Sequence, residues 1–371
     1  MRVDVAIVGA GPAGSTLAAL VARRGVDVAL IDRDDFPRDK LCGEFLSYDA
    51  LPVLEKLGVT FDAPQISRCR VVARHRVYEF DFPAAARGVS RMFLDDLLFR
   101  TAIAAGARSF AGWTATSLRP LTIERNGEQQ AIEAKTIVGA WGRWGRFDQQ
   151  LGRTFVRNRS HRSFGFKRHY EVRGPEDART RAHVIELYSF RGGYLGVSPI
   201  ENGQINICGL VHASRLTGLK GRWDSFVDTI RREEKQLDAM YARYEPAQES
   251  FLSSEPVIFR ARSPVEEGVF MVGDASGIVD PLTGNGMAMA IQSAAVALPY
   301  ILNRDADGYR RAHETFFRKR IRWSRRVAMI LSRPALLDAA LMAARSPRIG
   351  RFLLTQTRAE ANALHQLVLV Q

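Results

Sequence analysis

The stretch Gly9-Ala10-Gly11-Pro12-Ala13-Gly14 decides the fold, because it has the pattern G-x-G-x-x-G in a setting that gives each glycine a physical role. The apolar run Val3 to Val8 before it predicts a buried parallel strand, and residues Ala13 to Arg24 after it predict a helix. The first glycine allows a tight turn, the second lets the backbone approach a pyrophosphate, and the third lets the helix pack closely on the strand. The positive end of the helix then faces the phosphate charge, which predicts a bound dinucleotide.

An acidic residue follows the second predicted strand, Val26 to Ile31. This residue, Asp32, lies 18 positions beyond Gly14, close to the roughly 20 expected for the carboxylate that accepts hydrogen bonds from the adenosine ribose. A glycine-rich turn by itself is equally consistent with a structural loop. The strand, the helix and the acid together favour a nucleotide site.

A second signature lies more than 250 residues downstream, at Gly273-Asp274-Ala275-Ser276-Gly277-Ile278-Val279-Asp280-Pro281. Asp274 would lie at the carboxyl end of a strand over Gly268 to Val272, where its carboxylate can accept hydrogen bonds from ribityl hydroxyls. Gly284-Asn285-Gly286 then opens a predicted helix from Met287 to Leu302, whose first N–H groups can stabilise negative charge on a reduced flavin ring. The alternative is a plain strand-to-helix turn. With the first signature, the pattern predicts bound FAD.

The length and the cysteine content limit the classes of protein to which the chain can belong. At 371 residues the chain exceeds a single core of roughly 100–200 residues, so two joined domains are expected. The three cysteines, Cys42, Cys69 and Cys208, lack C-x-x-C spacing, which argues against a disulfide framework or a metal site and favours a reducing compartment, the cytoplasm. Neither a signal peptide nor an apolar run of about 18 residues is found, so an integral membrane protein is not expected.

The net charge of +13 is concentrated between Arg310 and Arg326, where eight basic residues accompany one acid, Glu314. Two interpretations stay open for this stretch: a solvated helix face, or a peripheral contact with a membrane. The second rests on the apolar residues that interleave with the basic ones, namely Phe316, Phe317, Ile321 and Trp323. Nucleic-acid binding is not expected, since no recognised binding module accompanies the charge.

The organisation along the chain is discontinuous. Period-two runs between Ser163 and Val211 predict an antiparallel sheet, the expected substrate domain. We therefore predict an α/β fold with a Rossmann-like FAD-binding domain, an inserted antiparallel β-sheet substrate domain and a helical C-terminal region. The FAD-binding domain would comprise residues 1–67, 88–155 and 256–303, the substrate domain 68–87 and 156–255, and the helical region 304–371. No second G-x-G-x-x-G follows a strand, so a separate nicotinamide domain is not expected.

The chain resembles the flavin-dependent superfamily of geranylgeranyl reductases, aromatic hydroxylases and flavin-dependent halogenases over roughly residues 1–300, and the reductase-like branch most closely. Arg91 with Leu94, Asp95 and Leu98 is similar to the family's R-x-x-L-D-x-x-L helix, whose arginine lies near the flavin. Pro37 to Glu44 resembles the reductase branch, whose K-x-C-G segment lies against the isoalloxazine. Gly193 to Pro199 resembles the aromatic-to-proline strand over the substrate cavity.

Several departures from the family patterns narrow the function. Many hydroxylases carry Asp-Gly where this chain has Trp141-Gly142, within Ala140 to Trp144. The W-x-W-x-I-P motif of the halogenases is absent, and the sequence around Lys40 differs from that around the halogenase lysine. Halogenation is therefore not expected. Leu195-Gly196 departs from the aromatic-rich strand of the reductases, so their lipid substrate cannot be carried over.

The expected catalytic residues are Cys42, Glu44 and Tyr194. The Cys42 thiol would position substrate, or relay a proton if Lys40 lowers its pKa; the alternative is a small buried hydrophobe. Glu44 would hold a backbone group or a substrate hydroxyl, or be a surface carboxylate. His169, His183 and His212 lack metal-ligand spacing and are expected to be structural. The expected FAD contacts are Gly9, Gly11, Pro12, Ala13, Gly14, Asp32, Arg33, Lys40, Cys42, Gly43, Arg91, Gly273, Asp274, Pro281, Gly284, Asn285, Gly286 and Met287.

The function that these observations favour is FAD-dependent oxidation-reduction of a hydrophobic small molecule. Reduction of a carbon–carbon double bond, in an isoprenoid or polyene-like compound, is favoured over oxygen insertion because Pro37 to Glu44 matches the reductase branch and the Asp-Gly pair is missing. The alternatives are a monooxygenase acting on a phenolic or polyketide compound and a catalytically silent flavin-binding protein. NAD(P)H or an electron-donor protein stays open as the source of electrons.

Overall fold

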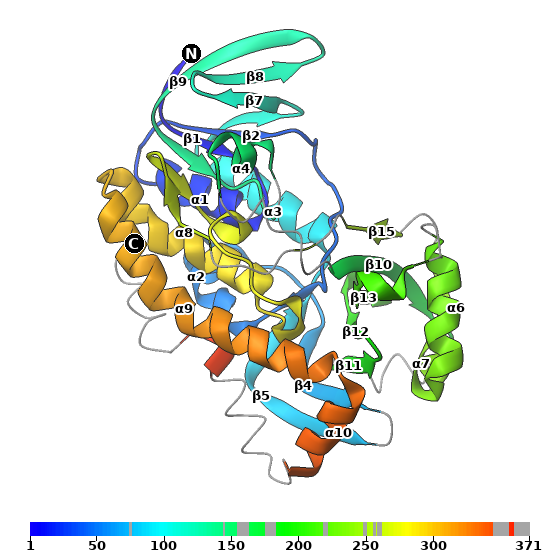
Figure 1. The fold of residues 1–371 in the computed structure, drawn as a ribbon. Helices are drawn as coiled ribbons and strands as arrows, with labels where there is room; N and C mark the ends of the chain where they lie inside the picture. Colours follow the sequence, from blue (N-terminus) through cyan, green and yellow to red (C-terminus); the bar gives the residue numbers. More distant parts are fainter. Residues whose placement is uncertain are drawn as a thin grey trace.

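The computed structural model describes residues 1–73, 76–143, 145–153, 163–174, 183–217, 222–247, 251–254, 257, 262–343 and 356–359. Two β-sheets organise these residues (Figure 1). The first carries the N-terminal strand and is covered by helices. The second lies beside it and is covered on its outer face by a helical pair.

The first sheet has a parallel centre in the order β6-β2-β1-β9-β17. The bounds are β1 Arg2–Val8, β2 Val28–Asp32, β6 Arg108–Ala111, β9 Glu128–Gly139 and β17 Val269–Met271, with β16, Val265–Glu266, antiparallel at the edge. Strands β1, β2 and β17 are largely buried and mostly apolar, as the Val3 to Val8 run predicted, whereas β6 and the first part of β9 are more exposed and more polar. Helix α1, Pro12–Ala22, packs on α3, Arg91–Ala104, and on α8, Gly286–Leu302.

A hairpin extends this sheet where the sequence had suggested no strand. Strands β7, Thr114–Leu118, and β8, Leu121–Arg125, pair antiparallel with each other, and β8 pairs with β9. Strand β9 is twelve residues long and ends at Gly139. A short helix, α4, Arg146–Gln150, follows.

The second sheet has the order β14-β10-β13-β12-β11-β4-β5-β3. The bounds are β3 Phe45–Leu46, β4 Gln65–Val72, β5 Val77–Gly88, β10 Ser163–Val172, β11 Val184–Phe190, β12 Gly193–Pro199, β13 Ile205–His212, β14 Tyr244–Pro246 and the added β15 Leu252–Ser253. The antiparallel sheet predicted between Ser163 and Val211 is confirmed for β10 to β13, although β11 pairs parallel with β4. Two helices, α6, Trp223–Glu233, and α7, Lys235–Tyr241, precede strand β14 and are separated by the extended backbone at Glu234.

Helices complete the fold. Helix α2, Leu51–Lys56, lies against α8, and the C-terminal part consists of α9, Ala306–Leu331, and α10, Pro334–Ala343. Figure 1 shows α9 running alongside α8 and reaching toward β4 and β5, where α10 lies. In the part of the chain that the structure describes, no helix combines the length and the apolar character needed to span a bilayer.

The basic stretch Arg310 to Arg326 lies on α9, where its apolar and its basic residues lie on different faces of the helix. Phe317 and Ile321 are buried in the core with α1 and α8, so these two residues are not available to a membrane, and the peripheral contact itself stays a prediction. A helical period places them on the inner face, while most of the basic residues, such as Arg311, Arg318 and Arg322, lie on the exposed face.

Candidate functional site

The glycine turn between β1 and α1 has no room for side chains at two of its glycines. A Cβ at Gly9, whose φ is +110°, would lie 2.3 Å from the carbonyl oxygen of Ala140, and a Cβ at Gly14 would lie 1.8 Å from the carbonyl oxygen of Gly9. The Ala10 amide donates to the Asp32 carboxylate over 2.7 Å. The helix therefore sits directly on the strand, with Asp32 fixed beside its N-terminus.

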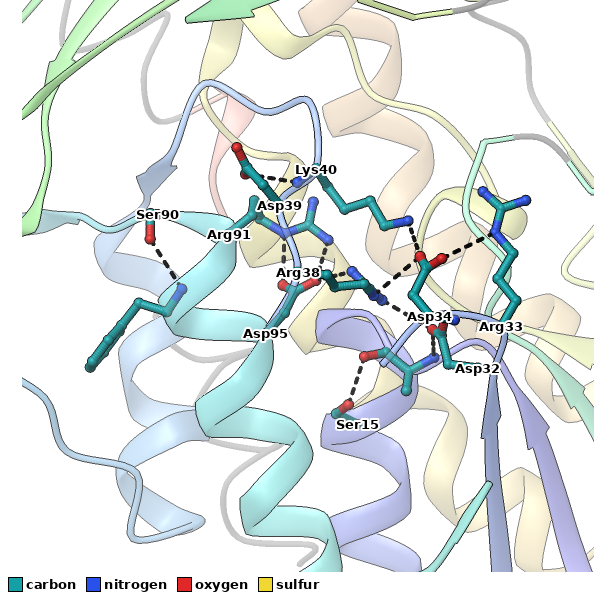
Figure 2. A network of polar contacts seen from close by, with 12 residues as sticks. Ser15, Asp32, Arg33, Asp34, Arg38, Asp39, Lys40, Ser90, Arg91 and Asp95 are labelled. Atoms are coloured by element: carbon teal, nitrogen blue, oxygen red, sulfur yellow. Dashed lines mark hydrogen bonds and ion pairs between the residues drawn. The ribbon is translucent and has the colours of Figure 1, made fainter. Parts of the chain in front are cut away.

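Asp32 belongs to a chain of charges that runs to α3 (Figure 2). Arg38 donates to Asp32 over 3.0 Å and to Asp95 over 2.8 Å. Arg91 binds Asp95 with two hydrogen bonds of 2.7 and 2.8 Å. Asp95 is fully buried, so these two arginines neutralise it and are in turn held in place. Arg91 lies near the turn, since its Nη2 is 3.7 Å from the position of a Cβ at Gly11.

Arg33 and Lys40, two predicted cofactor contacts, are both directed at Asp34. Lys40 forms an ion pair with that carboxylate, and Arg33, whose side chain is largely exposed, lies 3.7 Å from it. Figure 2 shows both side chains converging on Asp34. The Arg33 and Lys40 side chains therefore lie on the same side of the glycine turn as Asp32. Sequence reasoning missed Arg38, because nothing in the run Pro37 to Glu44 distinguishes it from its charged neighbours.

The expectation that Lys40 lowers the pKa of Cys42 is wrong. Burial raises the pKa of the Cys42 thiol, opposed most strongly by the nearby Arg91 guanidinium. The thiol is therefore protonated at neutral pH, and it accepts a hydrogen bond from the Glu44 amide over 3.4 Å. The arrangement gives a neutral thiol on a fixed backbone rather than a reactive thiolate.

Glu44 is the centre of a buried charged cluster rather than a surface carboxylate. One carboxylate oxygen accepts from Lys167 over 2.6 Å and from the Arg91 amide over 2.8 Å, and the other lies 2.7 Å from Nε2 of His169. Lys167 also donates to Asp39 over 2.6 Å. The Glu44 and Lys167 side chains are both 0% exposed. Burial by itself would lower the pKa of Lys167, but Glu44 and Asp39 raise it overall, so the ammonium stays charged.

These contacts fasten the segment that carries Cys42 onto β10 and β13. Besides the Lys167 contacts, the side-chain amide of Asn206 donates to the Cys42 carbonyl over 2.9 Å. Leu41 covers Gly165, where an added Cβ would lie 2.8 Å from the leucine side chain. The alternation of the strands puts Lys167, His169 and Asn206 on the face toward the first sheet's domain. The side-chain oxygen of Asn206, Oδ1, is buried and has no hydrogen-bond partner among the described residues.

Tyr194, the third predicted catalytic residue, projects from β12 to Asp280 in the second signature. Its hydroxyl donates to Asp280 over 3.0 Å, and the Leu282 amide donates to the same oxygen over 3.1 Å. Burial raises the pKa of Asp280 to about 6 despite these hydrogen bonds. Burial, together with Asp280, also raises the pKa of Tyr194 well above its usual value. The sequence pattern does not single out Asp280, because its partner Tyr194 lies 86 positions away.

Asp274 lies just after β17, at the carboxyl end of the strand as predicted. Burial raises the pKa of its carboxyl, opposed by Arg143, Arg262 and Arg91. The loop is held by its backbone: the Gly273 amide donates to Ser293 over 2.7 Å, and Arg262 donates to the Asp274 carbonyl over 3.1 Å. The carboxylate is thus positioned among cations.

The turn into α8 contains the remaining predicted contacts. Pro281 is exposed, Gly284 has a φ of +60° with Phe45 packed against it, and the Met287 side chain is buried in the core. The Asn285 side chain contacts Arg320 and the Thr357 carbonyl rather than the N-terminus of its own helix. Because these two side chains point elsewhere, Asn285 and Met287 can contact a ligand through their backbone groups only.

The residues present fit a flavin dinucleotide. An added Cβ would meet no atom within 4 Å at Gly43 or Gly286 and only Arg91 at Gly11, so these three glycines border open space. The pyrophosphate would lie at the N-terminus of α1, whose preceding Gly11 supplies no side-chain cap. The ribose would lie by Asp32, and the flavin end between Arg91, Gly43 and the start of α8.

Trp141 explains one departure from the hydroxylase pattern. Its indole packs on Phe147 at 5.2 Å and occupies the space next to Gly139 and Gly145, where an added Cβ would lie within 2.6 Å of the ring. The side chain is structural here. The neighbouring Trp144 of the same segment lies outside the described residues.

Comparisons with known proteins agree with this geometry. The family described as "FAD binding domain" matches residues 2–81 and 97–327. The chain is 30% identical to a menaquinone reductase of Mycolicibacterium smegmatis, over 91% of this chain and 86% of the relative. It is 27% identical to digeranylgeranylglycerophospholipid reductase 2 of Methanopyrus kandleri, over 80% of this chain and 76% of the relative. The solved structure of the flavin-dependent brominase Bmp2 has the same fold, with a TM-score of 0.78, 18% identity and coverage of 99% of this chain and 97% of that one.

Proposed function

The chain belongs to the FAD-binding-domain family and is an FAD-dependent oxidoreductase, and we propose that it reduces a carbon–carbon double bond in a hydrophobic, isoprenoid-like substrate. The observation that carries the proposal is the segment from Lys40 to Glu44, which resembles the reductase branch in sequence and is held rigidly in the structure. Glu44 and Lys167 fasten it to the sheet, while Lys40 is turned away to Asp34. The two relatives compared above, which align with most of this chain, are reductases by name.

The reaction adds a hydride and a proton across the double bond. Bound FAD, once reduced, supplies the hydride when it lies against Gly43 and the start of α8. The proton must come from the chain, and we propose the Tyr194–Asp280 pair, joined by a hydrogen bond of 3.0 Å, as its source. When Asp280 is protonated it can donate to the tyrosine oxygen, which frees the tyrosine O–H to protonate the substrate carbon.

Anaerobic turnover tests this function. The purified holoenzyme, reduced with dithionite or NAD(P)H, would be incubated without oxygen with menaquinone and with a geranylgeranyl-bearing phospholipid. After any quinol has been reoxidised in air, a reductase of the isoprenoid chain leaves a product two hydrogens heavier, with one double bond saturated for each two electrons consumed. Product that forms only with oxygen, and carries an added oxygen atom, would make the protein a monooxygenase and refute the proposal.

The proton source predicts a pH dependence. Asp280, with a pKa of about 6, is protonated below that pH and ionised above it. Because the protonated form resupplies Tyr194, kcat should fall as the pH rises through about 6. Asp280→Asn should lower kcat by about 10²-fold and remove this limb of the profile, since an amide accepts the tyrosine hydrogen bond but transfers no proton. An unchanged profile in the variant would exclude Asp280 as the proton source.

We also propose that the exposed basic face of α9 contacts anionic lipid, where a hydrophobic substrate would be dissolved. Arg311, Arg318, Lys319, Arg322 and Arg326 are exposed along this helix. The protein should sediment with vesicles that contain phosphatidylglycerol and not with pure phosphatidylcholine vesicles. Arg322→Glu with Arg326→Glu should abolish the binding, as should about 0.5 M salt. Equal binding to both vesicle types would refute an electrostatic contact.

A further inference from the structure

A short C-terminal segment, Gln356 to Ala359, is built into the back of the flavin site proposed above. We infer that this segment, here named the C-terminal strap, holds the Asn285 side chain away from α8 and thereby keeps the N-terminus of that helix open for the flavin. The inference rests on the proposed position of the flavin. Figure 1 shows the strap as the short red piece beside α9.

The unusual feature is the conformation of Asn285. Asparagine at the residue before a helix normally accepts a hydrogen bond from an N–H group of the first turn. Asn285 precedes α8 but makes no such bond. Its side-chain amide donates to the Thr357 carbonyl, and its carbonyl oxygen accepts from Arg320 over 3.2 Å. The first N–H groups of α8 are therefore left without a side-chain cap.

The contacts of Arg320 explain why the strap is needed. This arginine, 3% exposed, donates to Gln292 over 2.7 Å, to Asp49 over 3.2 Å and to the Thr357 carbonyl over 3.4 Å. The Ala359 amide donates to the same Asp49 oxygen over 3.1 Å. The strap thus completes a buried polar cluster drawn from four distant parts of the chain, and its backbone supplies the acceptor that both Asn285 and Arg320 share.

Removal of the strap should have two effects on the bound flavin. The NH2 group of Asn285 would lose its acceptor, and the side chain could then rotate so that its oxygen leaves Arg320 and accepts from an N–H group of α8, in competition with the cofactor. Arg320 would lose a partner that holds it near the start of α8, where its positive charge favours a reduced, negatively charged flavin ring. Flavin affinity and midpoint potential should both fall.

Matched truncations test the inference. A chain ending at Glu360 keeps the strap, and a chain ending at Thr355 lacks it. FAD titration of the two apoproteins, followed by flavin fluorescence, should give a dissociation constant about tenfold higher for the shorter chain, as expected for the loss of one or two buried hydrogen bonds. Its flavin midpoint potential, measured by dye equilibration, should be more negative.

A second variant covers the case in which the shorter chain does not fold. Ala359→Pro in the full-length protein removes the N–H that donates to Asp49 and should weaken FAD binding in the same direction. Equal dissociation constants and potentials for the two truncations, or for Ala359→Pro and the unaltered protein, would overturn the role of the strap. Failure of the full-length protein itself to bind FAD would refute the flavin site instead.

Discussion

Lys167→Met is expected to lower the free energy of unfolding by about 3–5 kcal/mol, the usual cost of leaving a buried carboxylate without its partner. Lys167 lies between Glu44 and Asp39, 2.6 Å from an oxygen of each, and its side chain is fully buried. Methionine has a similar volume but no charge, so Glu44 would keep only the Arg91 amide and His169 as donors. Urea unfolding of the apoprotein, followed by circular dichroism, measures the change.

Two further variants separate the lost charge from a general disturbance of β10. Arg168 is the next residue, and its ion pair with Asp224 is on the surface at 3.4 Å; Arg168→Met should cost about 1 kcal/mol or less. Lys167→Met combined with Glu44→Gln should recover part of the loss, because the uncompensated carboxylate is gone. Equal destabilisation by Lys167→Met and Arg168→Met would show that the buried cluster contributes no more than a surface pair.

Sequence reasoning identified the parts of the site that depend on local spacing. The glycine turn, Asp32, Asp274 and the start of α8 each follow a strand or open a helix, so their positions are set by the nearest element. The α/β fold with an antiparallel second sheet is confirmed, since it follows from the period of the apolar residues.

The residues that sequence reasoning missed act across long separations in the chain. Lys167 meets Glu44 from 123 positions away, and Tyr194 meets Asp280 from 86. No spacing rule links such pairs. In β10 the alternation puts Lys167 and His169 on one face with Ser163, Gly165 and Glu171, and a face of that composition does not mark the two side chains as buried. The β7–β8 hairpin was missed because its strands are short and partly polar.

Gly14→Ala and Gly43→Ala are expected to impair flavin binding for opposite reasons. At Gly14 the new Cβ would lie 1.8 Å from the Gly9 carbonyl oxygen, which is backbone and cannot rotate aside. Helix α1 would have to move off β1, at a cost of at least about 3 kcal/mol. We expect the Gly14→Ala protein to be unstable as apoprotein and to bind no FAD.

Gly43→Ala should leave the apoprotein intact. No atom lies within 4 Å of the new Cβ, and the φ of Gly43 is not in the left-handed region, so the substitution should leave stability unchanged or raise it by up to about 1 kcal/mol. The methyl group would nevertheless occupy space proposed for the flavin ring, and the FAD dissociation constant should rise by at least about tenfold. Thermal unfolding of the apoproteins and FAD titration separate the two effects. Unchanged FAD affinity in Gly43→Ala would show that the flavin does not lie against this glycine, and the open space at Gly43 would then have to be assigned to the substrate.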